Sequence, residues 1–261
     1  MAEKDSLKKG DGGAGAGAVY VVGIGPGSLE HLTERAKAAI RESDCIVGYT
    51  RYVGLIEELT KGKEVFSNGM TFEVERCRKA LEMAGAGRKV SVISSGDSGI
   101  YGMAGLILQI SASEGVKVRV EVVPGIPAFV AAASILGAPL MHDFASISLS
   151  DLLTDWEKIE ERVDMAARAD FVIALYNPKS SKRVEGLGKA IEIVRRYRKG
   201  TTPVGLVRNA TREGEEVVLT TLDELEGYYE RVDMLSIIII GNSTTFRADE
   251  RMVTPRGYRD I

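Results

Sequence analysis

Short apolar runs alternate with segments of helical period along this chain, and this alternation constrains the fold more than any other feature. The runs of the first half are predicted strands, at residues 18–23, 45–48, 90–94 and 118–123. The segments of helical period between and after them are predicted helices, at residues 29–43, 50–59, 73–84 and 101–113. This order predicts strands linked by crossover helices in a mostly parallel sheet.

The second half repeats the alternation after a chain break at Gly137-Ala138-Pro139. A short helix at 127–136 precedes the break, with Pro127 in its first turn, where a missing N–H costs nothing. The predicted strands that follow are 145–149, 170–176, 203–208, 216–220 and 235–241. The predicted helices are 151–168, 183–198 and 221–229.

The predicted fold class is therefore α/β, with two α/β domains of mostly parallel sheets and a ligand cleft between them. We assign residues 18–142 to an N-terminal domain and 143–261 to a C-terminal domain. Residues 1–17, rich in Gly, Ala and Lys, are assigned to a flexible leader because they lack the apolar core of a signal peptide.

Composition narrows the classes of partner. The formal net charge of −3 argues against a broad electrostatic grip on nucleic acid. The two cysteines and two histidines are not at metal-ligand spacing, so no protein-bound metal is expected, and so few cysteines fit the cytoplasm. The apolar run at 234–241 is too short to cross a bilayer and is typical of a strand covered on both faces, so no membrane partner is expected.

The loop after the first strand, GIGPGS at 23–28, does not fit a dinucleotide site. Its glycines follow G-x-G-x-G rather than G-x-G-x-x-G, and no acidic residue ends the second strand. Pro26 also removes one N–H from a phosphate cradle. A tight glycine turn without a ligand remains an alternative for this loop alone.

The loop after the third predicted strand, SSGDSGIYGMAG at 94–105, offers more chemistry. Gly96 and Gly99 allow a ligand to approach the backbone, and the Asp97 carboxylate is an acceptor suited to hydroxyls or an ammonium group. The alternative is that Asp97 or Ser98 simply caps the following helix.

Three more loops follow predicted strands: VVPGIPAFVAAAS, ALYNPKSSKR and GLVRNATREGEE. Each one alone also fits a plain turn or a solvated helix start. No Walker A loop, H-E-x-x-H pair or G-x-S-x-G elbow occurs in the sequence. The loops together indicate a small-molecule site made of backbone and small side chains.

Taken in order, GIGPGS, SSGDSGIYG, VVPGIPA, ALYNP and VRNAT resemble the tetrapyrrole methylase family over about residues 18–245. The resemblance implies two α/β domains, usually in a homodimer, and methyl transfer from S-adenosylmethionine with S-adenosylhomocysteine as product. It implies donor contacts at Pro26, Gly96, Asp97, Ile100, Ala128, Tyr176, Asn177 and Ala210. This chain has Pro127 where many relatives have Ser or Thr, and proline offers only its carbonyl.

Within the family, MHDFASISLSDLLTDW, ALYNPKS and VGLVRNATREGE are similar to the branch that methylates C17 of precorrin-3B or its cobalt form. That branch also promotes contraction of the macrocycle in cobalamin biosynthesis. The alternatives are a sister methylase acting on precorrin-4 or a similar substrate, and a methyltransferase like diphthine synthase. A non-catalytic module that senses tetrapyrroles or nucleotides is an alternative of another class.

Ring contraction requires proton movement, so general acid–base residues are expected. His142 and Asp143 are the first candidates, and Asp97 is another; the alternative for His142 is a histidine satisfied by backbone. A precorrin carries many carboxylates, which cationic side chains bind. The candidate substrate-binding residues are Lys179, Lys182, Arg183, Arg208 and Arg212.

Overall fold

The structure is a computed structural model that describes residues 17–259, and its contacts divide the chain into two compact units. The first unit runs to Gly25 and from Leu29 to Gly125; the second holds Pro26–Ser28 and everything from Ile126 onward. The sequence predicted the division after residue 142. It falls earlier because helix α6 (Ala128–Leu136) packs on strands of the second unit. The predicted leader lies outside the described residues, apart from Gly17.

The first unit is built on a sheet of five strands, and every neighbouring pair in it is parallel, as predicted. The order across the sheet is β3 (Glu64–Asn68), β2 (Cys45–Tyr49), β4 (Lys89–Ser94), β1 (Ala18–Gly23) and β5 (Arg119–Val123). Strand β3 was not predicted. Its residues are all exposed or half-buried, so they form no apolar run.

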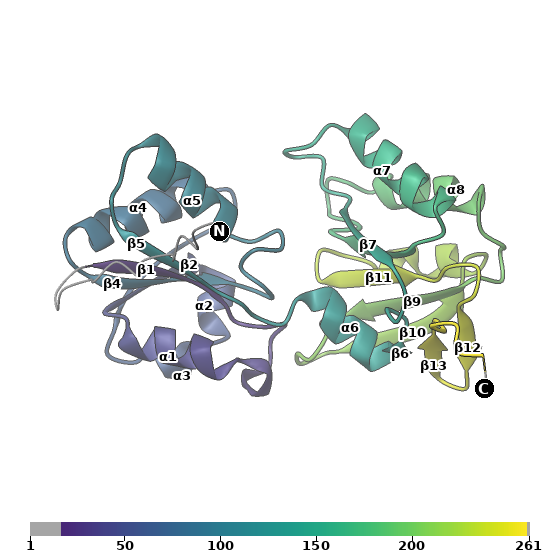
Figure 1. Cartoon of the computed structure of the whole chain (residues 1–261), viewed down its shortest axis with the longest axis horizontal. Coiled ribbons are helices and arrows are strands. Elements are labelled where there is room, and N and C mark those ends of the chain that lie inside the picture. The colour runs from purple at the N-terminus through teal and green to yellow at the C-terminus, as the bar shows by residue number, and fades with distance from the viewer. Residues whose placement is uncertain (1–16, 260–261) are drawn as a thin grey trace, which may run out of the picture. The chain divides into compact units, whose positions relative to one another are not determined.

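Helices cover both faces of this sheet (Figure 1). On one face are the 3-10 helix η1 (Leu29–His31), α1 (Glu34–Glu42), α2 (Thr50–Gly54) and α3 (Glu57–Thr60). On the other are α4 (Glu73–Gly85) and α5 (Ala104–Ser113). Helix α1 turns one apolar stripe to the sheet, since Ala36, Ala39 and Ile40 are fully buried. Thr33 caps this helix by accepting a hydrogen bond from the Ala36 N–H at 3.1 Å.

The second unit holds a five-stranded sheet that corrects the prediction of mostly parallel pairing. Its order is β10 (Glu216–Thr221), β9 (Pro203–Arg208), β11 (Ser236–Ile240), β8 (Val172–Tyr176) and β7 (Phe144–Ser148). Only β7 and β8 are parallel; the other three pairs are antiparallel. The short connection between β9 and β10 allows only a hairpin. Strand β11 is buried along its whole length, as its apolar run predicted.

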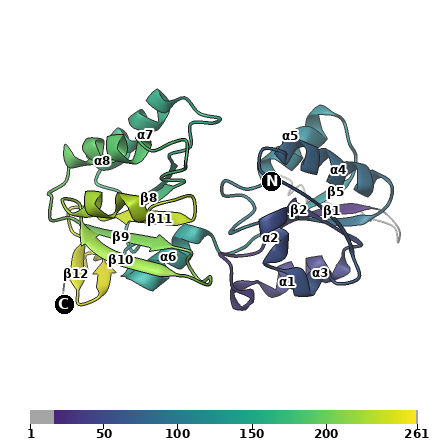
Figure 2. The same ribbon diagram turned by 180° about the vertical axis from the view of Figure 1, so that it is seen from behind.

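Helices α7 (Trp156–Arg168) and α8 (Gly186–Arg195) lie on one face of this sheet and α6 lies on the other (Figure 2). A Cβ atom at Gly205 would stand 2.3 Å from Leu136 Cδ1, so the glycine allows α6 to pack directly on β9. The remaining elements are the 3-10 helix η2 (Leu225–Arg231) and a small sheet of β12 (Phe246–Ala248), β13 (Arg251–Val253) and β6 (Gly137–Ala138). No helix in residues 17–259 is long and apolar enough to span a membrane.

Candidate active site

Three of the glycine-rich loops meet at one edge of the first unit. Strands β4, β1 and β5 are parallel neighbours, so their carboxyl ends lie at the same edge. Gly25, after β1, and Gly96, after β4, form a two-hydrogen-bond bridge with N···O distances of 3.0 and 2.7 Å. Both glycines have positive φ, 75° and 66°. The first two loops of the sequence therefore form one continuous backbone surface.

The third loop closes on the other two with no room for side chains. A Cβ atom at Gly125 would lie 2.2 Å from the Gly96 carbonyl oxygen and 2.6 Å from that of Gly23. A Cβ atom at Gly23 would lie 2.7 Å from both the Gly125 nitrogen and the Gly96 oxygen. Real Cβ atoms do not approach this closely, so glycine is required where these loops touch. Close packing of the loops therefore explains why Gly23 ends β1 and Gly125 follows β5.

The Asp97 carboxylate joins the second and third loops. Its Oδ1 accepts a hydrogen bond from the Gly99 N–H at 2.8 Å, and its Oδ2 accepts one from the Gly125 N–H at 3.0 Å. Each oxygen keeps a further acceptor position, because a carboxylate has about four lone-pair directions. Asp97 is half-buried, so those positions remain open to a hydroxyl or ammonium group of a ligand.

The rest of the SSGDSGIYGMAG stretch is a structured loop rather than the predicted start of a helix. Helix α5 begins at Ala104 instead of residue 101. The Ser98 side chain is fully buried and its hydroxyl donates to the Val123 carbonyl at 3.2 Å. Tyr101 has a positive φ of 52° and is 55% exposed, and the predicted donor contact Ile100 is half-buried beside it. A long loop therefore remains available for ligand contact.

In the second unit, Tyr176 ends β8 and holds the first turn of α6. Its hydroxyl accepts a hydrogen bond from the Phe129 N–H at 3.2 Å, one of the N–H groups that a helix start leaves unpaired. The two rings also contact edge to face, with centroids 6.1 Å apart. The predicted contact Ala128 precedes Phe129, so this bond brings two of the predicted donor residues together.

Asn177 and Ala210 lie at the same edge of the second sheet as Tyr176. Asn177 has φ 50° and donates from Nδ2 to the hydroxyl of Ser148, the last residue of β7, at 2.9 Å. Strand β9 is antiparallel to β11, which is antiparallel to β8, so β9 and β8 run in the same direction. Ala210, 7% exposed, follows the end of β9. Both motifs therefore follow strands that end at the same edge of the sheet.

The loop around Ala210 is bent tightly, with positive φ at Asn209 and Thr211. The Thr211 N–H donates to Glu215 Oε2 at 2.7 Å, and the Asn209 amide donates to the Gly214 carbonyl at 3.3 Å. The Thr211 hydroxyl oxygen, however, is buried without a hydrogen-bond partner among the described residues. A buried polar atom without a partner is costly, so this hydroxyl is available to a ligand.

Pro26 and Arg212 contact each other within the second unit. Arg212 Nε donates a short hydrogen bond to the Pro26 carbonyl. A Cβ atom at Gly27 would lie 2.2 Å from Arg212 Cγ, so the loop depends on glycine here as well. Arg212 therefore positions the GPG turn, a role that differs from the substrate contact predicted for it.

Three other predicted substrate cations are engaged by the fold. Lys179 donates to the Tyr229 carbonyl at 2.9 Å, and Arg183 to the Leu149 carbonyl at 2.8 Å. Arg208 binds Asp233 at 2.9 Å, and this hydrogen bond raises the pKa of the guanidinium. Lys182 is exposed and has no such partner in the part of the chain that the structure describes.

His142 and Asp143 lie at the opposite edge of the second sheet from Tyr176. They precede β7, which starts at Phe144, and β7 runs parallel to β8. His142 Nδ1 accepts the Asp143 N–H at 2.8 Å, and both side chains are exposed, by 49% and 80%. The structure does not bring this pair to the loops that hold Tyr176, Asn177 and Ala210. In residues 17–259 no three His, Cys, Asp or Glu side chains gather where they could hold a metal ion.

Two apolar residues that sequence reasoning missed are exposed beside these loops. Leu152 and Leu153, 76% and 99% exposed, follow β7 at the edge where Tyr176 ends β8. The signal was present in the SDLLTDW segment, where an apolar pair stands among polar residues instead of on a helical stripe. Helix α7 begins only at Trp156, so the pair is on a loop and not on the predicted helix at 151–168.

Glycine backbone, a held carboxylate and small side chains at strand ends are typical of a small-molecule site on an α/β protein. The sequence pattern of the Tetrapyrrole (Corrin/Porphyrin) Methylases matches residues 18–226, and the chain belongs to that family. It is accordingly a methyltransferase, as the order of its loops predicted.

The chain is similar to proteins of related description. It is 51% identical to a cobalt-factor III methyltransferase of Priestia megaterium. That match covers 93% of this chain but only 45% of the relative. It is 49% identical to a probable cobalt-factor III C(17)-methyltransferase of Salmonella typhimurium, over 91% of this chain and 98% of the relative. The crystal structure of the methyltransferase CobJ matches with 36% identity and a TM-score of 0.86, over 92% of this chain and 100% of that one.

A further solved structure bears on the donor. A uroporphyrin-III C-methyltransferase from Thermus thermophilus, complexed with S-adenosyl homocysteine, matches with 25% identity and a TM-score of 0.65. The match covers 86% of this chain and 97% of that one. The fold of this chain is therefore shared with a protein whose structure contains the demethylated form of the donor.

Proposed function

We propose that this chain methylates C17 of a precorrin-3B-type tetrapyrrole, using S-adenosylmethionine, and promotes contraction of the macrocycle in cobalamin biosynthesis. The observation that carries the proposal is the match to the Salmonella relative, which extends over nearly the whole of both chains. Because that relative is described as a C(17)-methyltransferase, we assign C17 as the carbon that this chain methylates. Cobalt, where present, belongs to the substrate.

The residues present fit S-adenosylmethionine as the donor. The contacts among Gly23, Gly96 and Gly125 bring the main chain of three loops together with no side chains between them, which suits a ligand bound against main chain. The remaining acceptor positions of Asp97 suit the ribose hydroxyls or the ammonium group. The buried Thr211 hydroxyl supplies an unused polar atom beside Ala210.

S-adenosylmethionine supplies an electrophilic methyl group on a sulfonium, so this chain needs no side-chain nucleophile. The S–CH3 bond breaks as the bond to C17 forms, and its electron pair remains on sulfur. The contribution of the protein is to hold the loops in fixed positions. Orienting two reactants can supply up to about 7–11 kcal/mol in model systems. The hydrogen bonds of Asp97 and Tyr176 hold these loops in place.

We assign substrate binding to exposed side chains beside the loops that follow β7 and β8. Lys182 is a cation available for a carboxylate of the macrocycle, and Leu152 and Leu153 offer apolar contact to its ring face. For proton transfer during ring contraction, Asp97 ranks before His142 and Asp143, because it lies among the donor loops. We retain His142 as a candidate to be tested, with Asp143 as its neighbour.

The test is methyl transfer under anaerobic conditions from labelled S-adenosylmethionine to precorrin-3B, cobalt-factor III and a cobalt precorrin-4 side by side. Mass spectrometry of each product is expected to show one added methyl group on a C17-type substrate. Label on the precorrin-4 substrate alone would replace this proposal with the sister activity. Binding of a tetrapyrrole or a nucleotide without any transfer would support the sensing module instead. With S-adenosylmethionine at saturating concentration, His142→Ala and Asp97→Asn are then compared, and the variant that forms methylated but uncontracted product identifies the residue that moves the proton.

We also propose that the protein acts in the cytoplasm as a homodimer. Both cysteines, Cys45 and Cys77, are free and fully buried, and burial raises the pKa of the Cys77 thiol to about 12. Thiols kept reduced in the core are consistent with a reducing compartment. Fractionation of the native host, followed by detection with an antibody, checks the location.

A further inference from the structure

The proposed donor loops occupy only part of the edge at which the strands of the first sheet end. All neighbouring strands in the order β3-β2-β4-β1-β5 are parallel, so their carboxyl ends share that edge. The donor loops follow β4, β1 and β5, and the ends of β2 and β3 have no assigned role. Neighbouring strands lie about 4.8 Å apart, so the end of β3 is about 10 Å from that of β4. A tetrapyrrole whose C17 meets the donor extends well beyond the methyl group, and the ends of β2 and β3 are close enough for it to contact.

Arg51 is a free cation at this edge. It lies in the first turn of α2, which follows β2 directly, and it is exposed. Its guanidinium has no hydrogen bond or ion pair among the described residues. The other free cations of the first unit stand at the opposite edge, since Lys61, Lys89 and Lys117 precede or begin β3, β4 and β5. Within residues 17–125, Arg51 is therefore the one unpaired cation at the carboxyl edge, and a guanidinium binds carboxylates such as those of a precorrin.

The turn between β3 and α4 is built on a buried cation. The side chain of Arg76, only 4% exposed, donates to Asn68 Oδ1 at 2.6 Å and to the Gly69 carbonyl at 2.7 Å. It also pairs with Glu73 at 3.1 Å. Burying a guanidinium is costly without such partners, so these bonds fix the turn in place. The Thr50 hydroxyl donates to the Asn68 carbonyl at 3.1 Å, which ties the same turn to the end of β2.

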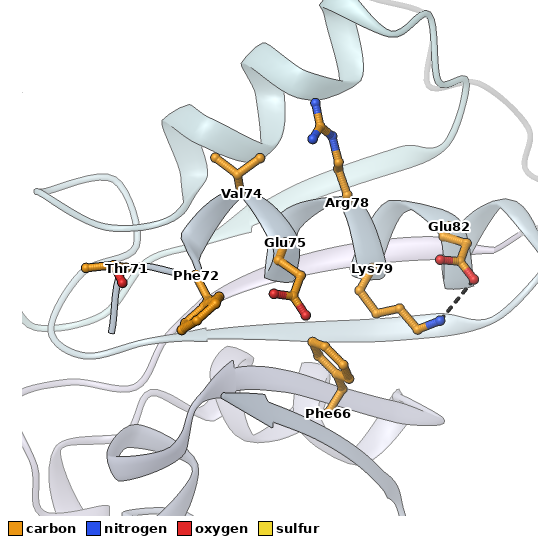
Figure 3. A pocket seen from close by; sticks show the side chains of 8 residues that line it. All are labelled: Phe66, Thr71, Phe72, Val74, Glu75, Arg78, Lys79 and Glu82. Carbon is orange, nitrogen blue, oxygen red and sulfur yellow. Dashed lines mark hydrogen bonds and ion pairs between the residues drawn. The ribbon is translucent and has the colours of Figure 1, made fainter. Parts of the chain in front are cut away.

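This turn holds two apolar side chains in solvent on a strained backbone. Met70 and Phe72 are 53% and 50% exposed. Between them Thr71 has a φ of 70°, which is an outlier for a β-branched residue. Thr71 and Phe72 stand at one end of a hollow of about 550 Å³ that runs between α4 and β3 (Figure 3). Backbone strain persists only where the surrounding structure holds it, so the exposure of these apolar groups is a built feature of the turn.

We infer that the ends of β2 and β3 form a substrate-binding surface, on which Arg51 pairs with a carboxylate of the tetrapyrrole and Met70 and Phe72 contact the face of its ring. The inference rests on the proposed function and extends it, because it assigns substrate selection to residues of the first unit outside the proposed donor contacts. Tyr101, 55% exposed on the loop after β4, adds an aromatic ring on the side of the donor loops. An apolar ring system with anionic side chains matches this combination of apolar groups and one cation.

Steady-state kinetics of methyl transfer to cobalt-factor III, with S-adenosylmethionine saturating, test the role of the cation. Arg51→Glu is expected to raise the KM for the tetrapyrrole about tenfold and to leave kcat within about twofold of the wild type, because a cation away from the reacting carbon contributes to binding alone. Arg51→Lys keeps the charge and should recover most of the loss. Lys117→Glu makes the same change of charge at the amino edge of the sheet and, as the matched control, should keep the wild-type KM.

Phe72→Ser tests the apolar part of the surface. Phe72 is the N-cap residue of α4 and makes no side-chain cap hydrogen bond, so serine, a preferred N-cap residue, leaves the helix stable. The loss of apolar contact should raise KM about fivefold. Leu108→Ser, at an apolar residue of α5 that is 47% exposed, is the control and should leave KM unchanged. Circular dichroism and calorimetry with S-adenosylhomocysteine show whether each variant is folded and keeps its donor affinity.

The inference is overturned if Arg51→Glu and Phe72→Ser keep the wild-type KM, or if Lys117→Glu raises KM as much as Arg51→Glu does. A fall in kcat with an unchanged KM in Arg51→Glu would overturn it as well. If the wild type methylates only a cobalt precorrin-4, the C17 assignment fails, and the same variants compared on that substrate decide whether this surface binds the tetrapyrrole. If Phe72→Ser does not fold, Met70→Ser replaces it.

Discussion

The Asp97→Ala variant is the most informative single change, because Asp97 holds two loops and is a proposed donor contact. The substitution leaves the N–H groups of Gly99 and Gly125 without their acceptor. A hydrogen bond to a charged group contributes about 1.5–3 kcal/mol, and less where water can replace it. Asp97 is half-buried, so we expect the unfolding free energy of the first unit to fall by about 2 kcal/mol.

Donor affinity is expected to fall further than stability alone explains. Asp97→Ala removes the acceptor that faces the ligand and also loosens the loop at Gly125, so binding of S-adenosylhomocysteine should weaken by at least about tenfold, or about 1.4 kcal/mol. Asp97→Asn keeps one acceptor oxygen and should give an intermediate loss. Isothermal calorimetry measures the affinity, and urea unfolding followed by circular dichroism measures the stability.

Asp44→Ala is the matched control, because Asp44 also accepts a backbone N–H, that of Lys89 at 2.8 Å. It lies at the amino edge of the same sheet, where β2 and β4 begin. This variant should lose up to about 1 kcal/mol of stability and no donor affinity. If Asp97→Ala binds as tightly as the wild type, Asp97 is only a loop brace, and its assignment as a donor contact is wrong.

Three further predictions follow from the packing and the pKa values. Gly125→Ala should destabilise the first unit by about 1–3 kcal/mol, because the new Cβ would meet the Gly96 carbonyl oxygen at 2.2 Å. Gly85→Ala is the control, since a Cβ there would have nothing within 4 Å and the change should be neutral or stabilising. Urea unfolding compares the two variants. Tyr176→Phe should cost about 1 kcal/mol by leaving the Phe129 N–H unpaired, and similar unfolding midpoints for the two proteins would contradict this. Burial raises the pKa of Cys77 from 9.0 to about 12, so the contribution of the buried thiol to stability is complete below pH 9 and is lost as the pH rises toward 12. The unfolding free energy of Cys77→Ala should therefore depend less on pH over this range. Ellman's reagent should also label native wild type at pH 8 far more slowly than unfolded protein.

Much of the fold was predictable because its signals are local. Apolar runs located β1, β2, β4 and β5, and helical stripes located α1 and α4 to within a few residues. Strand β3 was missed because an edge strand with an exposed face needs no apolar run. The antiparallel pairing of the second sheet was also missed, since an apolar run such as that of β11 is buried on both faces whichever way it pairs.

In the loops, too, some features could be predicted from the sequence and others depend on the tertiary structure. Order and composition of five motifs determined the family, and Gly96 and Gly99 indicated a loop that a ligand could approach closely. That Gly125 touches Gly23 and Gly96, however, depends on the strand order β4-β1-β5, which no local pattern encodes. Likewise, only the direction of β7 shows that His142 and Asp143 stand at the other edge from Tyr176.

The sequence by itself determined the class of protein, the elements and the residue types of the site, because propensity and periodicity act over a few neighbouring residues. The tertiary structure decided which charges are free and which are engaged. Lys179, Arg183 and Arg208 looked alike as candidate substrate cations, but each is held by a partner distant in sequence, as is Arg212 by Pro26. Such pairings arise only when the chain folds, since they join groups that the sequence separates by 25 to 186 positions.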